Sequence, residues 1–319
     1  MIVAIDGPAG SGKSTVARAL SDRLDLIFLD TGAMYRSVTV ECLRQGIDMT
    51  DTEKIIQVAR SISISFAPDF ILFQEIDTSS DRSWHVNQVS EAESRFGSYA
   101  SYFAQNFHTA FLAYPLTEFH GTSNSGILTL SNVLASSATR RTYPIDESFP
   151  TKFFDLDRCF MITRYPTSDG HELVLINSHM SAYDKGGTSR AQQLALLTKI
   201  MSEERAKGNY VIAGGDWNHA ISGSLTLYPS VQQVPDWVAE LKDSDLPEGF
   251  SVVAPDNLND VPTCRGDDIP YEKDKTYTTT VDGWIVSDNV VATARNIDTQ
   301  FAYSDHNPVL LSFTLKSKE

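Results

Sequence analysis

A glycine-rich turn with a lysine near the start of the chain has the composition of a phosphate-binding loop. Residues 7–14 read Gly-Pro-Ala-Gly-Ser-Gly-Lys-Ser, the pattern G-x-x-x-x-G-K-S. An apolar run precedes this loop and a helical pattern follows it, which is the context that the motif requires. Lys13 would reach the terminal phosphates and Ser14 would ligate Mg²⁺. The loop therefore predicts a site for ATP, built from Gly7, Gly10, Ser11, Gly12, Lys13, Ser14 and Thr15.

Carboxylate, amide and imidazole side chains form a second set, in short motifs that each follow a predicted strand. A phosphate ester carries negative charge that repels a nucleophile, so a hard cation must neutralise it. Carboxylate oxygens are the ligands that Mg²⁺ prefers, and a histidine can activate water near neutral pH. The set predicts metal-dependent chemistry on a phosphate ester; its members are Gln74-Glu75, Asn177-Ser178-His179, Asp216-Trp217-Asn218, Asp282 and Ser304-Asp305-His306.

The elements that must position these residues change in character near residue 66. Before it, the patterns predict strands at 1–6, 26–29 and 61–66, and helices at 14–24, 34–45 and 51–60. After it, we expect helices at 90–106 and 190–207, and strands at 70–73, 126–130, 159–164, 173–177, 210–213, 281–286 and 309–315. No linker-like composition separates the two parts, although two independent domains usually have one.

The first part resembles the start of bacterial cytidylate (CMP/dCMP) kinase. The likeness rests on residues 5–17, which include the phosphate loop, and on residues 29–36, Leu-Asp-Thr-Gly-Ala-Met-Tyr-Arg. It implies that residues 30–35 shape a nucleoside-monophosphate site and that Arg36 holds the acceptor phosphate. The likeness covers about residues 1–66, and the later elements of that family, including its arginine-rich lid, do not follow.

The second part resembles the endonuclease/exonuclease/phosphatase family, which includes the DNase-I-like nucleases. The motifs occur in the order of that family from about Pro68 to Leu315. The resemblance implies a two-sheet α/β sandwich flanked by helices. The family begins with a strand that supplies an Asn to its site, but residues 1–66 contain no Asn. We therefore expect an altered active site.

The chemistry and the resemblance together assign roles to these side chains. Glu75 and Asp305 are the expected ligands of Mg²⁺, with Mn²⁺ as an alternative. His306 is the expected general base. Asp282 would orient His306, Asp216 and Asn218 would position the water or the phosphate, and His179 would stabilise developing charge. Four arginines are further candidates for phosphate contact, but we expect such isolated side chains to be solvated: Arg82, Arg140, Arg141 and Arg158.

The net charge of −15 is concentrated in the second part of the chain. Residues 1–66 hold 7 basic and 8 acidic residues, whereas residues 67–319 hold 19 and 33. Such a surface repels a polyphosphate backbone, so long nucleic acid is disfavoured and a small phosphate ester or a nucleotide is favoured.

The cysteines and the hydropathy indicate a cytoplasmic protein. Cys42, Cys159 and Cys264 are odd in number and widely spaced, which suits a reducing compartment. No apolar run approaches the roughly 20 residues of a spanning helix, and the N-terminus lacks the basic region of a signal peptide.

Three functions are thus open for two expected domains, a partial kinase-like segment at 1–66 and a phosphoesterase domain at 67–319. The first is Mg²⁺-dependent hydrolysis of a phosphate ester. The second is ATP-dependent phosphorylation of a nucleoside monophosphate, as in cytidylate kinase. The third is a joined chain that binds nucleotide while neither site turns over.

Overall fold

The computed structural model describes residues 42, 45–48, 50–61, 68–112, 121–144, 158–182, 188–236 and 238–316. The chain divides into two compact units, Met1–Pro68 and Asp69–Glu319. The phosphate loop, Arg36 and the elements predicted before residue 46 lie outside the described residues, except for Cys42 and Gln45. The strand predicted at 61–66 lies outside them too, apart from Ser61.

The described part of the first unit contains helix α3 (Thr52–Ser61), as predicted. Asp51 caps its N-terminus by accepting a hydrogen bond of 3.1 Å from the backbone N–H of Lys54. Val58 is buried. Among the described helices, none is long and apolar enough to span a membrane.

The second unit is built on a six-stranded sheet with the order β10-β13-β7-β6-β5-β4. Its central pair, β6 and β7, is parallel, and the other neighbours are antiparallel. The long helix α5 makes the crossover between that parallel pair. The bounds are β4 (Ser137–Thr142), β5 (Cys159–Pro166), β6 (Glu172–His179), α5 (Thr188–Ala206), β7 (Tyr210–Asp216), β10 (Phe250–Val252) and β13 (Asp282–Ser287).

A three-stranded sheet, β1-β3-β2, and a separate hairpin, β14-β15, complete the main strands. Shorter elements lie between them. The remaining bounds are β1 (Phe70–Asp77), η1 (Asp81–Ser83), α4 (Gln88–Arg95), β2 (Ala100–Leu112), β3 (Gly121–Ser131), β8 (His219–Ile221), η3 (Ser224–Thr226), β9 (Ala239–Leu241), η4 (Asp243–Asp245), β11 (Cys264–Arg265), β12 (Thr278–Thr279), β14 (Val290–Asn296) and β15 (Val309–Leu315).

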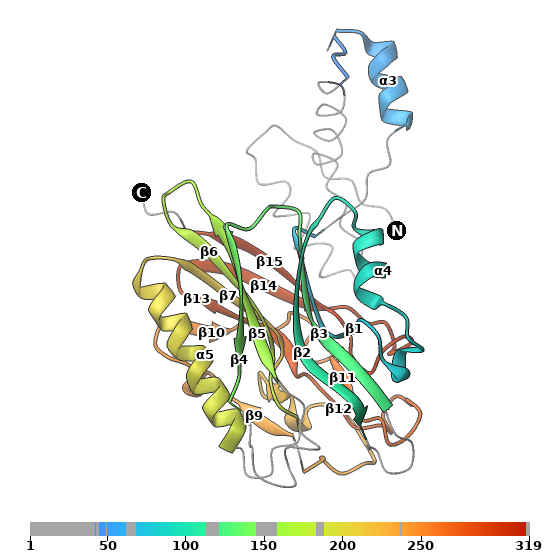
Figure 1. Cartoon of the computed structure of the whole chain (residues 1–319), viewed down its shortest axis with the longest axis vertical. Coiled ribbons are helices and arrows are strands. Elements are labelled where there is room, and N and C mark those ends of the chain that lie inside the picture. The colour runs from blue at the N-terminus through green and yellow to red at the C-terminus, as the bar shows by residue number, and fades with distance from the viewer. Residues whose placement is uncertain are drawn as a thin grey trace. The chain divides into compact units, whose positions relative to one another are not determined.

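The six-stranded sheet is the middle layer of this unit, with helix α5 on one face and the β14-β15 hairpin on the other (Figure 1). Val174 and Ile176 of β6 pack with Leu197 of α5 on one face. Leu173 and Leu175 of the same strand face the other way and pack with side chains of β1 and of the β14-β15 hairpin. Helix α4 covers the three-stranded sheet through Val89 and Ala92. The predicted two-sheet sandwich with flanking helices is thus the fold of this unit.

The helix predicted at 90–106 is wrong in its second half. Helix α4 ends at Arg95, and residues from Ala100 onward form β2. Strand β2 pairs with β3 from Ala100↔Ser131 to Leu112↔Gly121. Long-range pairing therefore overrides the local helical pattern of this segment.

Candidate active site

Three predicted site residues lie side by side because their strands are neighbours in the six-stranded sheet. His179 ends β6 and is the register partner of Asp216, which ends β7. Asp216 is in turn the partner of Asp282, the first residue of β13. Gly215 lets β6 and β7 approach each other closely at this point. A Cβ on Gly215 would lie 1.9 Å from the carbonyl oxygen of Ser178, so a larger residue would not fit.

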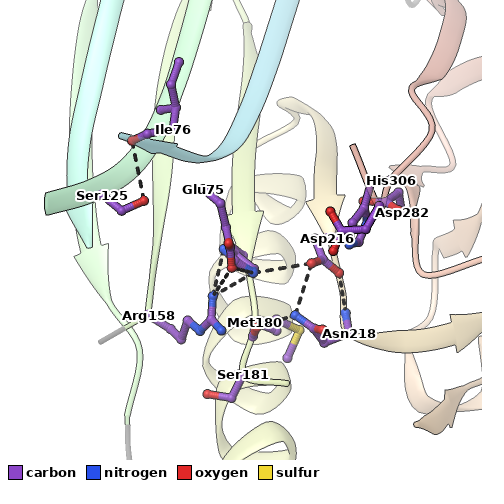
Figure 2. A network of polar contacts seen from close by, with 12 residues as sticks. Glu75, Ile76, Ser125, Arg158, Met180, Ser181, Asp216, Asn218, Asp282 and His306 are labelled. Atoms are coloured by element: carbon purple, nitrogen blue, oxygen red, sulfur yellow. Dashed lines mark hydrogen bonds and ion pairs between the residues drawn. The ribbon is translucent and has the colours of Figure 1, made fainter. Parts of the chain in front are cut away.

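Glu75 reaches the same region from a bulge in β1 (Figure 2). The pairing of β1 with β3 shifts between Phe73 and Ile76. Glu75 adopts a φ of 51°, a left-handed conformation that costs a non-glycine residue about 1 kcal/mol. A bulge turns a side chain away from its regular position in the strand. Gln74, beside Glu75, donates a hydrogen bond of 2.7 Å to Asn177, which ties β1 to β6.

Basic side chains surround the Glu75 carboxylate. Arg82 Nη1 lies 2.9 Å from Oε2, while Arg158 Nη1 and His179 Nε2 lie 3.6 and 3.7 Å from Oε1. Desolvation raises the pKa of Glu75, but His179, Arg158 and Arg82 together hold it well below its usual range. Glu75 is therefore ionised, and its charge is already balanced by these neighbours.

Arg82 is itself fixed by a second carboxylate. Its Nε and Nη2 donate hydrogen bonds of 3.0 and 2.9 Å to the buried Asp77. Desolvation lowers the pKa of Arg82, but the hydrogen bonds to Asp77 and the charge of Glu75 outweigh it and raise this pKa above its usual value. Arg82 thus stays charged and locks the orientation of Glu75.

Arg158 and His179 form a buried pair next to Glu75. Arg158 Nη1 lies 2.7 Å from Nε2 and 2.9 Å from Nδ1 of the His179 ring. Both side chains are at most 4% exposed. The expectation of a solvated side chain is therefore wrong for Arg158, which is buried beside an imidazole that is distant in sequence. Arg82 is exposed as a residue, yet it pairs with two carboxylates, those of Glu75 and Asp77. Arg140 and Arg141 are exposed, as expected.

Asp216 and Asn218 form a compact turn at the end of β7. The backbone N–H and the side-chain Nδ2 of Asn218 donate to Asp216 at 2.8 and 3.2 Å. Nδ2 also donates to the carbonyl oxygen of Met180 at 2.8 Å. His179 Nε2 lies 3.3 Å from Asp216 Oδ2. Burial raises the pKa of Asp216, but the hydrogen bond from His179 and the charge of His306 lower it below its usual value.

His306 and Asp282 form the pair that the sequence predicts. Their Nδ1 and Oδ2 atoms lie 2.7 Å apart. Burial lowers the pKa of His306, but the nearby Asp282 carboxylate raises it well above the usual value. Cys264, a buried residue that the sequence analysis did not place in the site, forms a β-bridge with His306. No pattern in the sequence predicts that Cys264 lies in the site, because the bridge that brings it next to His306 joins residues far apart in the chain.

The described residues contain one group with the donor set of a cation site. Asp216, Asp282 and His306 offer ligand atoms that all lie within 4.8 Å of one another. Carboxylate oxygens with one imidazole suit a hard divalent cation such as Mg²⁺ or Mn²⁺. Burial raises the pKa of Asp282, and a cation would favour its charged form. Asp305 precedes His306 but is exposed and is not part of this group.

Comparison with solved structures agrees with the layered fold. A crystal structure of an endonuclease/exonuclease/phosphatase from Beutenbergia cavernae is similar with a TM-score of 0.54 and 13% sequence identity, over 78% of this chain and 63% of that one. ANGEL2, a 2′,3′-cyclic phosphatase, is similar with a TM-score of 0.50 and 16% identity, over 78% of this chain and 82% of its own. The second unit has the endonuclease/exonuclease/phosphatase fold.

Sequence comparison gives the other resemblance. Residues 3–106 match the cytidylate kinase family. Cytidylate kinase of Clostridioides difficile is 47% identical over 66 residues, which are 21% of this chain and 31% of that protein. The chain therefore spans about a third of the length of this curated relative. Both resemblances drawn from the sequence are confirmed.

Proposed function

We propose that the second unit hydrolyses a phosphate ester with the help of a divalent cation, His306 acting as general base. The observation that carries the proposal is the 2.7 Å contact between His306 and Asp282 inside a group of hard ligand atoms that includes Asp216. In this proposal residues 67–319 are the hydrolase domain of a cytoplasmic protein, and residues 1–66 are a partial nucleotide-binding segment.

The proposed step transfers one proton and exchanges one P–O bond. Because Asp282 holds Nδ1 of His306, the ring would take the proton of the attacking water at Nε2. The water oxygen bonds to phosphorus as the ester P–O bond breaks, and the alkoxide that leaves takes up a proton from solvent to become the alcohol. Asp216, held by Asn218, would position the water, and His179 would contact the phosphate. The buried charge of Arg158 would favour the extra negative charge of the transition state.

The cation would supply charge neutralisation at the phosphate. Glu75 and Asp305 are the ligands proposed from the sequence, and Asp216 and Asp282 are additional donors from the group described above. The acidic surface favours a small or accessible ester over long nucleic acid.

Hydrolysis can be tested with bis-(p-nitrophenyl) phosphate and Mg²⁺. The purified chain should release p-nitrophenolate, and EDTA should stop the release. His306→Ala should lower the rate by roughly 10²- to 10⁴-fold, the usual contribution of a general base. Activity that survives both Glu75→Ala and His306→Ala would place the site elsewhere.

A second function, nucleotide binding by the first unit, is supported by the match of residues 3–106 to cytidylate kinase. ATP with Mg²⁺ should bind, and Lys13→Ala should weaken that binding in calorimetry. Lys54→Ala, on the exposed Lys54 of α3, is the matched control. CMP phosphorylation should be absent or barely detectable, because phosphoryl transfer needs charge neutralisation and the arginine-rich lid of that family does not follow residue 66. Robust conversion of CMP to CDP would put the kinase function first.

The third hypothesis, a joined chain without turnover, predicts a different result in the same assays. ATP would bind in a Lys13-dependent manner, while neither p-nitrophenolate nor CDP would form.

A further inference from the structure

A cavity of about 490 Å³ in the second unit has the size of a small-molecule site. It is separate from the His306–Asp282 pair, and none of the residues assigned above to the phosphate or the cation lines it. Its lining includes three aromatic residues, three carboxylates and one lysine: Tyr228, Tyr271, Phe301, Asp260, Asp274, Asp298 and Lys273.

One wall of the cavity is hydrogen-bonded to the segment that carries the proposed catalytic pair. Pro262 lines the cavity, and its carbonyl oxygen accepts a hydrogen bond of 2.9 Å from Asn307, the neighbour of His306. The next residue, Thr263, accepts a hydrogen bond of 3.1 Å from the backbone N–H of Asp282. The Pro262–Thr263 segment therefore connects the cavity wall to the catalytic pair.

Aromatic rings make up much of the cavity wall. Tyr271 and Phe301 meet edge to face, with ring centroids 4.8 Å apart. Tyr228 is anchored by its hydroxyl, which lies 2.5 Å from the carbonyl oxygen of Leu258 and 2.9 Å from Thr280 Oγ1. An aromatic ring attracts a cation that approaches its face, and rings fixed in this way lose little conformational freedom when a ligand packs against them.

The charge of the lining is negative. Asp260, Asp274 and Asp298 outnumber the single Lys273. Burial raises the pKa of Tyr228 to about 12, and the nearby charge of Asp260 adds to the rise. Such a wall repels a phosphate and attracts an organic cation.

The carboxylates of the cavity are too dispersed to chelate a compact metal ion. In the part of the chain that the structure describes, three or more His, Cys, Asp or Glu ligand atoms lie within 4.8 Å of one another only in the group of Asp216, Asp282 and His306. A broad cation that touches rings and several separated carboxylates suits this arrangement better.

We propose that the cavity binds the ammonium group of the substrate, which is a phosphate ester of an amino alcohol. This inference rests on the proposed phosphoesterase function. The phosphate would face His306, and the ammonium group would lie among Tyr271, Phe301 and Asp298. The cavity would thereby select zwitterionic esters over wholly anionic ones.

Two chromogenic phosphodiesters with the same leaving group test the proposal. p-Nitrophenyl phosphorylcholine carries an ammonium group, and bis-(p-nitrophenyl) phosphate does not. Asp298→Asn should raise the KM of the choline ester by roughly 3- to 10-fold and change the KM of the other ester by less than about 2-fold. Tyr271→Ala should raise the KM of the choline ester by roughly 3- to 30-fold. Asp267→Asn, on an exposed acidic residue outside the lining, is the matched control.

Calorimetry separates this proposal from the proposed function. Choline should bind the full chain more tightly than its neutral isostere 3,3-dimethyl-1-butanol, and Asp298→Asn should remove the difference. If both esters are hydrolysed but choline shows no such preference, the cavity proposal is overturned and the hydrolase proposal stands. If neither ester is hydrolysed while the preference and its loss are observed, the hydrolase proposal fails and the ammonium site stands.

Discussion

At the scale of single residues, His306 depends on Asp282 for its protonation state. Burial lowers the pKa of His306, and the Asp282 carboxylate raises it well above the usual value. A general base acts only when neutral, so activity should rise with pH through that elevated pKa. We expect an alkaline optimum for hydrolysis.

Substitution of Asp282 tests this coupling. Asp282→Asn removes the charge that raises the pKa of His306, so the rising limb of the pH profile should move to lower pH. The plateau should fall, because the ring loses its orienting carboxylate. Measurement of kcat/KM between about pH 5 and 10 with bis-(p-nitrophenyl) phosphate gives both quantities. If the rising limb of the pH profile does not move in Asp282→Asn, a group other than His306 causes the pH dependence.

Residue type and motif order were enough to predict the His306–Asp282 pair, because a carboxylate and a histidine at strand ends carry recognisable chemistry. They were not enough for Arg82 and Arg158. A single arginine has no periodic signal, and the partners of Arg158, Glu75 and His179, are set by the tertiary fold.

At the scale of elements, the strand ends were predictable and the switch from α4 to β2 was not. The segment after Arg95 has a local pattern compatible with a helix, but its pairing with β3 lies beyond a local window. The bulge at Glu75 escaped prediction for the same reason, because it arises from the register of β1 against β3.

An ion-pair network at the C-terminal end of α5 gives a stability prediction at this scale. Arg164 of β5 lies 2.6 Å from Glu204, which is 5% exposed and also accepts from Lys207 and Asn209. The hydrogen bond from Arg164 is the main cause that lowers the pKa of Glu204 to about 2. This network joins the helix to the sheet.

Because folding lowers the pKa of Glu204, its ionised form stabilises the folded state. The contribution of Glu204 is present above its unfolded-state pKa of about 4.3 and is lost as the pH falls through about 2. Glu204→Gln should lower the free energy of unfolding at pH 7 by roughly 1–3 kcal/mol and should flatten its fall below about pH 5. Urea denaturation across that range measures both effects. If the free energy of unfolding falls with acid in the variant as it does in the wild type, Glu204 does not contribute to the acid dependence of stability.

At the scale of the whole molecule, two resemblances overlap in one segment. The match to cytidylate kinase runs to residue 106, yet residues 70–106 contain β1, α4 and part of β2 of the second unit. The pairing of β1 and β2 with β3 assigns this segment to the sandwich. The proposed hydrolase therefore depends on a segment that sequence comparison attributes to the kinase.

We propose that the end of the six-stranded sheet is a hydrolytic site. Its most direct test is Mg²⁺-dependent release of p-nitrophenolate by the intact chain, by His306→Ala and by His171→Ala. His171 precedes β6 at the end opposite His179, far along the strand from the site. We predict that His171→Ala hydrolyses at the wild-type rate while His306→Ala loses roughly 10²- to 10⁴-fold. Equal rates for the two variants, or no metal-dependent hydrolysis by the intact chain, would contradict the account.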